Sequence, residues 1–217
     1  MAYYTPTSVF RLVHFNETPL HRQAVAKTMD NFYSIGMPGR WYEELFEVAV
    51  GQYGYVTSAD VRDLGGYGGV LVDMERAGHL ERVARGLYRF VSYPVDPRDE
   101  LMAATLWSRS AGIISHDSAL DLWDLCDVNP AKVHVTVARS ARIRRTIPAA
   151  YQIHVRDLAP CEVGNVDGIP TVTAMRAILD GIERHLDRRL IKQAIDSATS
   201  RGLLLGSEHQ ALLEAAK

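Results

Sequence analysis

The apolar positions of residues 41–77 recur with the 3.6-residue period of helices. This period predicts three short helices. The first has an apolar stripe at i, i+4, i+7 and i+8, formed by Trp41, Leu45, Val48 and Ala49. The second has a start signal in Thr57 and Asp60, which have the spacing of a capping box. The third spans roughly residues 67–77 and stops at Gly78.

Two strand-like runs follow these helices, at residues 80–83 and 87–91. Ala84-Arg85-Gly86 joins them, and a glycine in so short a connection favours a hairpin turn. Three short helices followed by a hairpin, within about fifty residues, have the order of a winged helix-turn-helix. We therefore expect a DNA-binding domain of this kind over residues 41–95.

The rest of the chain divides into an extension before this domain and a mixed region after it. Residues 1–40 are expected to form an N-terminal extension with one helix, which starts at Thr18-Pro19. Residues 96–217 predict an α+β domain, a small mixed sheet with flanking helices. Its expected helices lie near 96–108, 115–125, 173–185, 188–201 and 207–216; its strands lie near 132–137 and 151–155, with a tight turn at 166–169.

Charge is distributed unevenly, although the net charge is only −2. Residues 41–91 hold five basic and eight acidic side chains, whereas residues 130–156 hold six basic and none acidic. The positive surface is therefore expected after the DNA-reading module rather than on it. A dimer or a partner domain would be one way to supply the missing positive charge.

The chain carries no signal for a membrane or for export. It has no run of about 18 apolar residues, and its N-terminus lacks the apolar core of a signal peptide. Cys126 and Cys161 stand alone and are expected to be thiols in a reducing compartment. We expect a cytoplasmic protein with no membrane partner.

Four segments together resemble the AbiEi-type antitoxins of abortive-infection toxin–antitoxin systems. The resemblance runs from about residue 41 to residue 200. The segments are GYVTS at 54–58, GHLERVARGLY at 78–88, ISHDSAL at 114–120 and GIPTVT at 168–173.

This resemblance implies a function with two partners. The winged helix would bind operator double-stranded DNA and repress the protein's own operon. The C-terminal domain would neutralise a cognate nucleotidyltransferase toxin. The resemblance implies no enzymatic activity and no cofactor.

Candidate DNA contacts lie on the third helix and the wing. With Leu71 and Met74 inward, the helix turns Tyr67, Gly69, Val70, Asp73 and Arg76 outward, which is a thin set for reading bases. Guanidinium groups on the wing suit phosphates and narrow minor grooves better. The DNA-binding candidates are Tyr67, Arg76, Arg82, Arg85 and Arg89.

A second basic group lies in the loop between the two expected strands. Four arginines within seven residues form a dense positive patch, and no aromatic residues interleave there. DNA backbone, an acidic toxin surface and RNA are its candidate partners, and a merely solvated loop is the alternative. The four are Arg139, Arg142, Arg144 and Arg145.

No catalytic or metal site is expected. Ser115, His116 and Asp117 are consecutive at a helix start, so they point in different directions and cannot act as a triad; Ser115 is expected to be the N-cap. His134 and His154 lie on neighbouring strand-like runs and could approach each other, but no third ligand is close in sequence.

Two other functions are weighed against the antitoxin. One is a stand-alone winged-helix regulator whose second domain binds a ligand or dimerises. The other is an endonuclease, which would need an Asp and a Glu-x-Lys pair on adjacent strands to hold a metal. The chain has no Glu-x-Lys sequence, which disfavours the nuclease.

Overall fold

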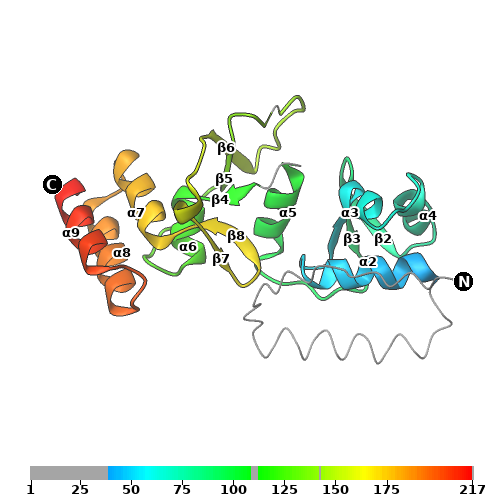
Figure 1. The fold of residues 1–217 in the computed structure, drawn as a ribbon, viewed down its shortest axis with the longest axis horizontal. Helices are drawn as coiled ribbons and strands as arrows, with labels where there is room; N and C mark the ends of the chain where they lie inside the picture. Colours follow the sequence, from blue (N-terminus) through cyan, green and yellow to red (C-terminus); the bar gives the residue numbers. More distant parts are fainter. Residues whose placement is uncertain (1–38, 109–111, 142, 217) are drawn as a thin grey trace, which may run out of the picture.

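The computed structural model describes residues 39–108, 112–141 and 143–216, and two β-sheets organise this part of the chain (Figure 1). The helix expected from Thr18 therefore lies outside the described residues. Helices and sheets together place the protein in the α+β class, as the sequence predicts. None of the helices in the described segments has the length and hydrophobicity needed to cross a membrane.

The first sheet belongs to a winged helix-turn-helix. Its strand order is β1-β3-β2, and both pairings are antiparallel. The arrangement of helices and strands confirms the order predicted from the sequence. The elements are α2 (Arg40–Val50), β1 (Tyr55–Thr57), α3 (Ser58–Asp63), α4 (Val70–Arg76), β2 (Leu80–Ala84) and β3 (Leu87–Phe90).

Local sequence signals account for the start of α3 and for the wing. The amide of Thr57 donates to the carboxylate of Asp60 at 2.6 Å, and Asp60 N donates to Thr57 Oγ1 at 3.3 Å. This is the predicted capping box. In the wing, Ala84 pairs with Leu87, so the turn is Arg85-Gly86 alone, with Gly86 at φ 77°.

Aromatic packing forms the core of the winged helix. The Phe90 ring lies 5.1 Å from the rings of both Tyr42 and Phe46, with edge-to-face geometry in each case. The buried side of α2 is therefore shifted from the predicted stripe, because Tyr42 and Phe46 are buried whereas Trp41 and Val48 are half-buried. The helical period fits two overlapping stripes, because Tyr42 and Phe46 also lie at helical spacing from Leu45 and Ala49, and packing on Phe90 of β3 selects the second stripe.

The second sheet has the strand order β6-β5-β4-β8-β7 and mixes parallel with antiparallel pairs. Helix α5 lies between this sheet and the winged helix, and α8 and α9 lie at the far end of the molecule (Figure 1). The elements are α5 (Asp99–Trp107), β4 (Ile113–Ile114), α6 (His116–Leu122), β5 (Val133–Val137), β6 (Tyr151–Val155), a 3-10 turn (Pro160–Glu162), β7 (Val163–Val166), β8 (Ile169–Val172), α7 (Ala174–Glu183), α8 (Arg188–Ser200) and α9 (Gly206–Ala215).

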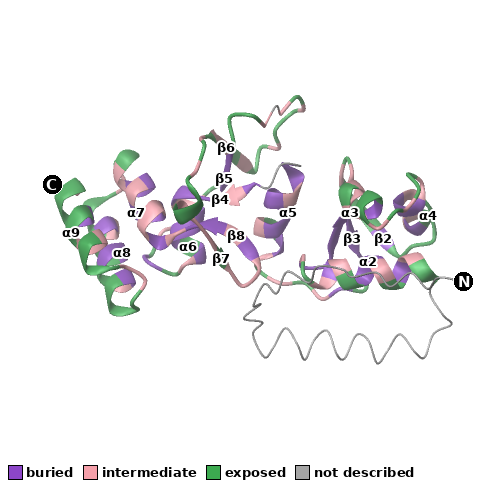
Figure 2. Ribbon diagram, viewed as in Figure 1, coloured by how far each residue is buried: buried purple, intermediate pink, exposed green. Residues whose placement is uncertain are grey.

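Strand β5 is buried along its whole length, as the strand colours of Figure 2 show. Side chains alternate between the two faces of a strand. Val135 therefore faces the α5 side, where it lies against Gly112, while His134 and Thr136 face α6. Strands β5 and β6 are parallel, so the connection between them crosses from one end of the sheet to the other, and most of its described residues, 138–141 and 143–150, are exposed.

Gly54 gives a direct test of the winged-helix packing. Its φ is +84°, and a Cβ at this position would lie 2.6 Å from the ring of the buried Tyr93. Replacing Gly54 by Ala should cost about 3 kcal/mol, since overpacking adds to the cost of the left-handed backbone. Gly65→Ala is the matched control, because Gly65 has φ +75° with open space around it; it should cost about 1 kcal/mol. Equal losses in urea denaturation would contradict the packing.

Candidate functional site

The wing presents two exposed arginines. Arg82 lies on β2 and Arg85 in the two-residue turn, and both side chains are exposed. The hairpin turn holds Arg85 at the tip of the wing, where a guanidinium could reach a phosphate. These two residues have the position that the sequence analysis expected of them.

Helix α4 exposes fewer of the candidate DNA-contacting side chains than the sequence predicts. It starts at Val70, three residues later than predicted, and Val70 is buried rather than outward. Tyr67 precedes the helix and donates its hydroxyl to Asp73 at 2.6 Å, while Arg76 lies 3.7 Å from the same carboxylate group. Asp73 therefore engages both of the exposed candidates on this side, Tyr67 and Arg76.

Arg89 does not lie on the surface as a DNA contact would. Its guanidinium donates to Asp99 at 2.8 Å and to the carbonyl of Pro94 at 2.9 Å, and only 9% of its side chain is exposed. The same guanidinium lies 5.9 Å from the Tyr55 ring. Burial raises the pKa of Asp99 above its ordinary value, against the opposing effect of Arg89. The alternation of buried and exposed side chains along a strand could not have predicted the Arg89–Asp99 pair, because all four residues of β3 are buried.

A cleft of about 480 Å³ lies between the winged helix and the second sheet. The winged helix contributes Arg62 and Arg85 to its lining, and the second part contributes Trp107 and Arg145. Positive side chains from two distant parts of the sequence therefore line one concave surface.

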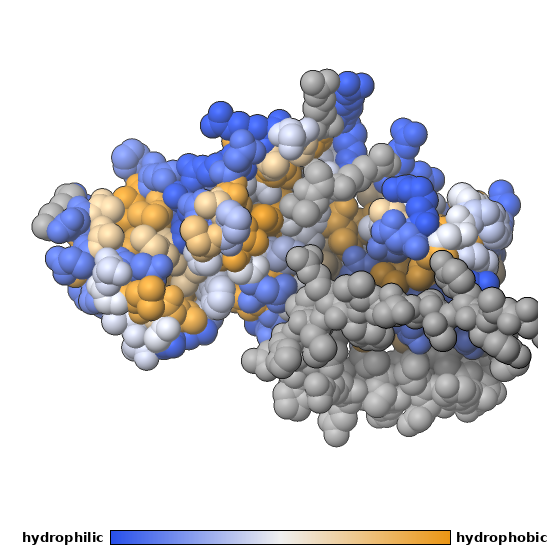
Figure 3. Space-filling view, in the orientation of Figure 1, coloured by the Kyte–Doolittle hydropathy of each residue, from blue (hydrophilic) through white to orange (hydrophobic). Residues whose placement is uncertain are grey.

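The described arginines of the β5–β6 loop have different surroundings. Arg145 lies with its guanidinium 4.1 Å from the centre of the Trp107 ring, whereas Arg144 is exposed. Arg139 is exposed and lies 3.8 Å from Asp157, and Arg142 lies outside the described residues. Figure 3 shows hydrophilic side chains at the tip of this loop, at the top of the view.

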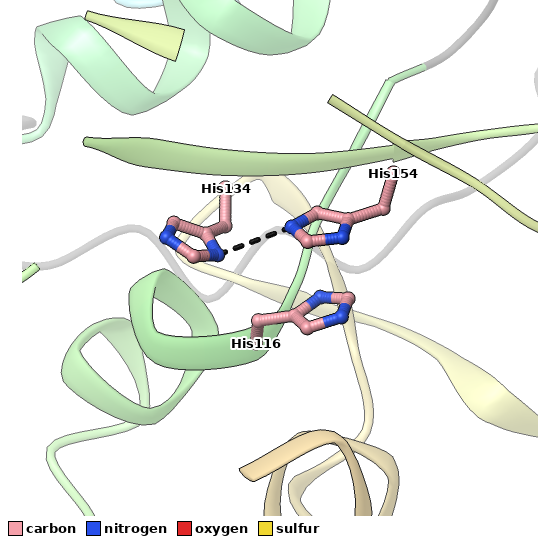
Figure 4. Close-up of side chains that lie close together, drawn as sticks. All are labelled: His116, His134 and His154. Carbon is pink, nitrogen blue, oxygen red and sulfur yellow. Dashed lines mark hydrogen bonds between the residues drawn. The ribbon is translucent and has the colours of Figure 1, made fainter. Parts of the chain in front are cut away.

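Three histidines lie close together on the α6 side of β5, opposite the face from which Val135 points toward α5. His116 comes from the start of α6, His134 from β5 and His154 from β6, and one ring nitrogen of each lies within 4.8 Å of the others (Figure 4). His154 Nε2 lies 3.2 Å from His134 Nδ1. The His116 and His154 rings stack with their centres 3.6 Å apart. The register of β5 and β6 produces this approach, since Thr136 pairs with His154 and His134 lies two residues away on the same face.

His116 reaches the cluster through an uncommon backbone conformation. Its φ is +54°, in the left-handed region that few non-glycine residues adopt. Such conformations cost about 1–3 kcal/mol and often lie at functional sites. Ser115 occupies the predicted N-cap position, but its hydroxyl makes no capping bond; it lies 2.9 Å from His116 Nδ1 and 2.8 Å from Thr136 Oγ1.

A buried carboxylate completes the surroundings. Asp180 of α7 is 1% exposed, and its Oδ2 lies 3.5 Å from His116 Nδ1. Its Oδ1 accepts from Arg156 at 2.9 Å and from Arg176 at 2.6 Å. Arg184 Nη1 lies 2.7 Å from His134 Nδ1.

Burial keeps these imidazoles neutral. Burial first, and then the neighbouring histidines and arginines, lower the pKa of His116 to about 3 and that of His154 to about 4. The pKa of His134 is also lowered, chiefly by burial and then by Arg184. At neutral pH each ring therefore keeps one nitrogen lone pair.

The sequence analysis paired His134 with His154 but did not find the third histidine. His116 lies 18 residues before His134, and the helical pattern assigned it to the first turn of a helix. Only the positive φ of His116 and the closeness of α6 to β5 bring the ring to the other two. His116 is the histidine of the ISHDSAL segment, but the spacing of the residues in that segment does not identify it as a metal ligand.

Comparison with known proteins agrees with the winged helix. Residues 43–91 match the family model described as "Transcriptional regulator, AbiEi antitoxin". A crystal structure of the RV2827C protein from Mycobacterium tuberculosis is similar to this chain at 14% sequence identity and a TM-score of 0.46, with 82% of each chain covered. No curated protein sequence matches the chain.

The Arg89–Asp99 pair predicts a specific pattern of stability. Arg89→Ala should cost on the order of 3 kcal/mol, because Asp99 would be left buried without its guanidinium. Arg89→Met with Asp99→Leu should recover most of that loss, since apolar residues can replace a buried pair. Arg82→Ala, on the exposed face of the wing, should change the free energy of unfolding by less than about 0.5 kcal/mol. A loss at Arg89 no larger than that at Arg82 in chemical denaturation would refute the structural role.

Proposed function

We propose that this chain, whose residues 43–91 match the family model of the AbiEi antitoxin transcriptional regulators, is the antitoxin of a toxin–antitoxin operon that it also represses. It would bind operator DNA through the winged helix and neutralise a nucleotidyltransferase toxin through its second part. It would act in the cytoplasm, without catalysis of its own. The single observation that carries the DNA-binding role is the winged helix with Arg82 and Arg85 exposed on its wing.

The distribution of charge supports contact through the wing. Tyr67 and Arg76 both lie against Asp73, so the α4 side combines positive and negative charge. The wing tip carries Arg85, and the cleft beside it also contains Arg62. Phosphate contacts provide most of the affinity of such modules, and they need positive side chains free to approach the backbone.

Electrostatics also favour DNA binding by more than one copy of the module. Residues 41–91 carry more acidic than basic side chains, and Arg89 is held inside by Asp99. A single winged helix would therefore neutralise few phosphates. In a homodimer two wings would bind two half-sites, which would double the number of phosphate contacts.

The β5–β6 loop is the surface that we assign to the toxin. Arg139 and Arg144 are exposed on this loop, which leads into β6, an edge strand of the sheet. Arg145 serves the fold instead, because it packs on Trp107. An acidic patch on the toxin would be the complementary partner.

Operator binding tests the DNA role. Replacing Arg82 and Arg85 together by Ala should weaken binding and should reduce the slope of log K against log salt by about one unit per lost phosphate contact. The measurement is a gel-shift or fluorescence-anisotropy titration over several salt concentrations. Arg188→Ala and Arg189→Ala, in the exposed first turn of α8, form the matched control. An unchanged slope in the wing variant would exclude the wing as the contact.

Growth rescue tests the toxin role. Reversing the charge of Arg139 and Arg144 to Glu should abolish rescue of cells that express the neighbouring toxin gene, while operator repression persists. A reporter fused to the operator measures repression in the same cells. Full rescue by this variant would exclude the loop. Repression without any toxin partner would favour a stand-alone regulator instead.

A further inference from the structure

The histidine cluster has no part in the proposed DNA or toxin contacts. We propose that His116, His134 and His154 form the binding site of one divalent metal ion of the zinc class. The site would join α6 to strands β5 and β6 in the second part of the molecule (Figure 4). This inference does not depend on the proposed antitoxin function.

The distances suit a tetrahedral ion. Zinc–nitrogen bonds of about 2.0–2.1 Å place neighbouring ligand atoms roughly 3.3 Å apart in a tetrahedron. His154 Nε2 and His134 Nδ1 are already 3.2 Å apart, and one ring nitrogen of His116 lies within 4.8 Å of both. The His116 ring stacks on the His154 ring with the ring centres 3.6 Å apart, so it must turn out of this stack for its lone pair to point at a shared ion.

The donor set selects the class of metal. Imidazole nitrogens suit zinc, cobalt, nickel and copper ions, whereas magnesium and calcium prefer oxygen ligands. His116 and His134 are buried and His154 is half-buried, so the ion would lie below the surface with one side open to water. Three protein ligands with a fourth open position are a known zinc arrangement.

Asp180 has the position of an outer carboxylate. Metal-bound histidines usually donate their other ring nitrogen to a carboxylate or a carbonyl, which fixes the ring. Asp180 Oδ2 lies 3.5 Å from His116 Nδ1, and its other oxygen is held by Arg156 and Arg176. With His116 Nδ1 oriented in this way, its Nε2 would be the atom available to the metal.

Charges of both signs surround the cluster. Carboxylates outnumber guanidinium groups by one in this network, but the nearby guanidinium groups of Arg184 and Arg156 oppose a positive charge at the rings of His116 and His154. The carboxylates are those of Asp117, Glu162, Asp180 and Glu183, and the guanidinium groups are those of Arg156, Arg176 and Arg184.

Arg184 is the group that a metal ion must displace. Its Nη1 lies 2.7 Å from His134 Nδ1, the atom that faces His154. The side chain is 42% exposed and already lies 3.6 Å from Asp117, so it can move toward solvent and keep this partner. Arg184→Gln should therefore tighten metal binding, since it removes the competing cation.

Metal titration of the full chain is the test. The protein, without any histidine tag, is stripped with a chelator and titrated with zinc by calorimetry. Cobalt is added in parallel, because tetrahedral cobalt gives intense visible absorption. We expect one ion per chain. His154→Gln and His134→Gln should each weaken zinc binding by about 100-fold or more. Loss of an outer-shell partner already weakens metal binding by about 10–100-fold, and each of these variants removes a direct ligand. Arg184→Gln should strengthen it.

His185→Asn is the matched control. His185 is exposed and has φ 58°, a conformation that Asn tolerates, so this variant should bind zinc like the native protein. Circular dichroism of each variant confirms that it folds. If a histidine variant does not fold, the cobalt spectrum of the native chain and the effect of Arg184→Gln decide the question. Absence of a stoichiometric ion, or zinc binding that neither His154→Gln nor Arg184→Gln alters, would overturn the proposal.

Discussion

The buried pair between Arg89 and Asp99 links the two parts of this molecule. Arg89 belongs to the last strand of the winged helix, and Asp99 opens the helix that covers the second sheet. Taking two charges out of water is costly, and a 2.8 Å hydrogen bond, a bond to the Pro94 carbonyl and packing on Tyr55 offset part of that cost. Helix α5 therefore has a defined position beside the wing. Tyr53 adds a second link, through its hydrogen bond to the carbonyl of Asp167 in the β7–β8 turn.

This link determines where positive charge can reach a partner. It removes Arg89 from the wing surface, and it places Arg145 and Trp107 across a cleft from Arg85. The cleft therefore has arginines from both parts in its lining, together with the carboxylate of Asp60, and Arg145 packs there on Trp107. The histidine cluster lies on the other face of β5, because side chains alternate along that strand. One buried strand thus separates this cleft from the group of metal-type ligands.

Much of the fold could be predicted because its signals are local. The Thr57–Asp60 capping box, the glycine of the wing turn and the turn at Asp167-Gly168 each depend on residues a few positions apart. The site was less predictable. Arg85 lies where turn chemistry puts it and Arg82 is exposed on β2, but Arg89 has the same residue type and the opposite environment. Residue type and spacing do not reveal a partner ten positions away on another element.

The sequence by itself determined the α+β class, the identity of the wing and most of the helices, since caps, turns and hydrophobic periods act within a few residues. It did not predict the short strands β1 and β4. The helical period of α2 fits two overlapping stripes, and the tertiary structure decided between them, because Phe90 packs against Tyr42 and Phe46. The tertiary structure also decided that His116 joins His134 and His154. That meeting needs a left-handed backbone at residue 116, the parallel register of β5 with β6 and the packing of α6 on β5. These are contacts between distant segments, and their free energy depends on the assembled core rather than on the local sequence.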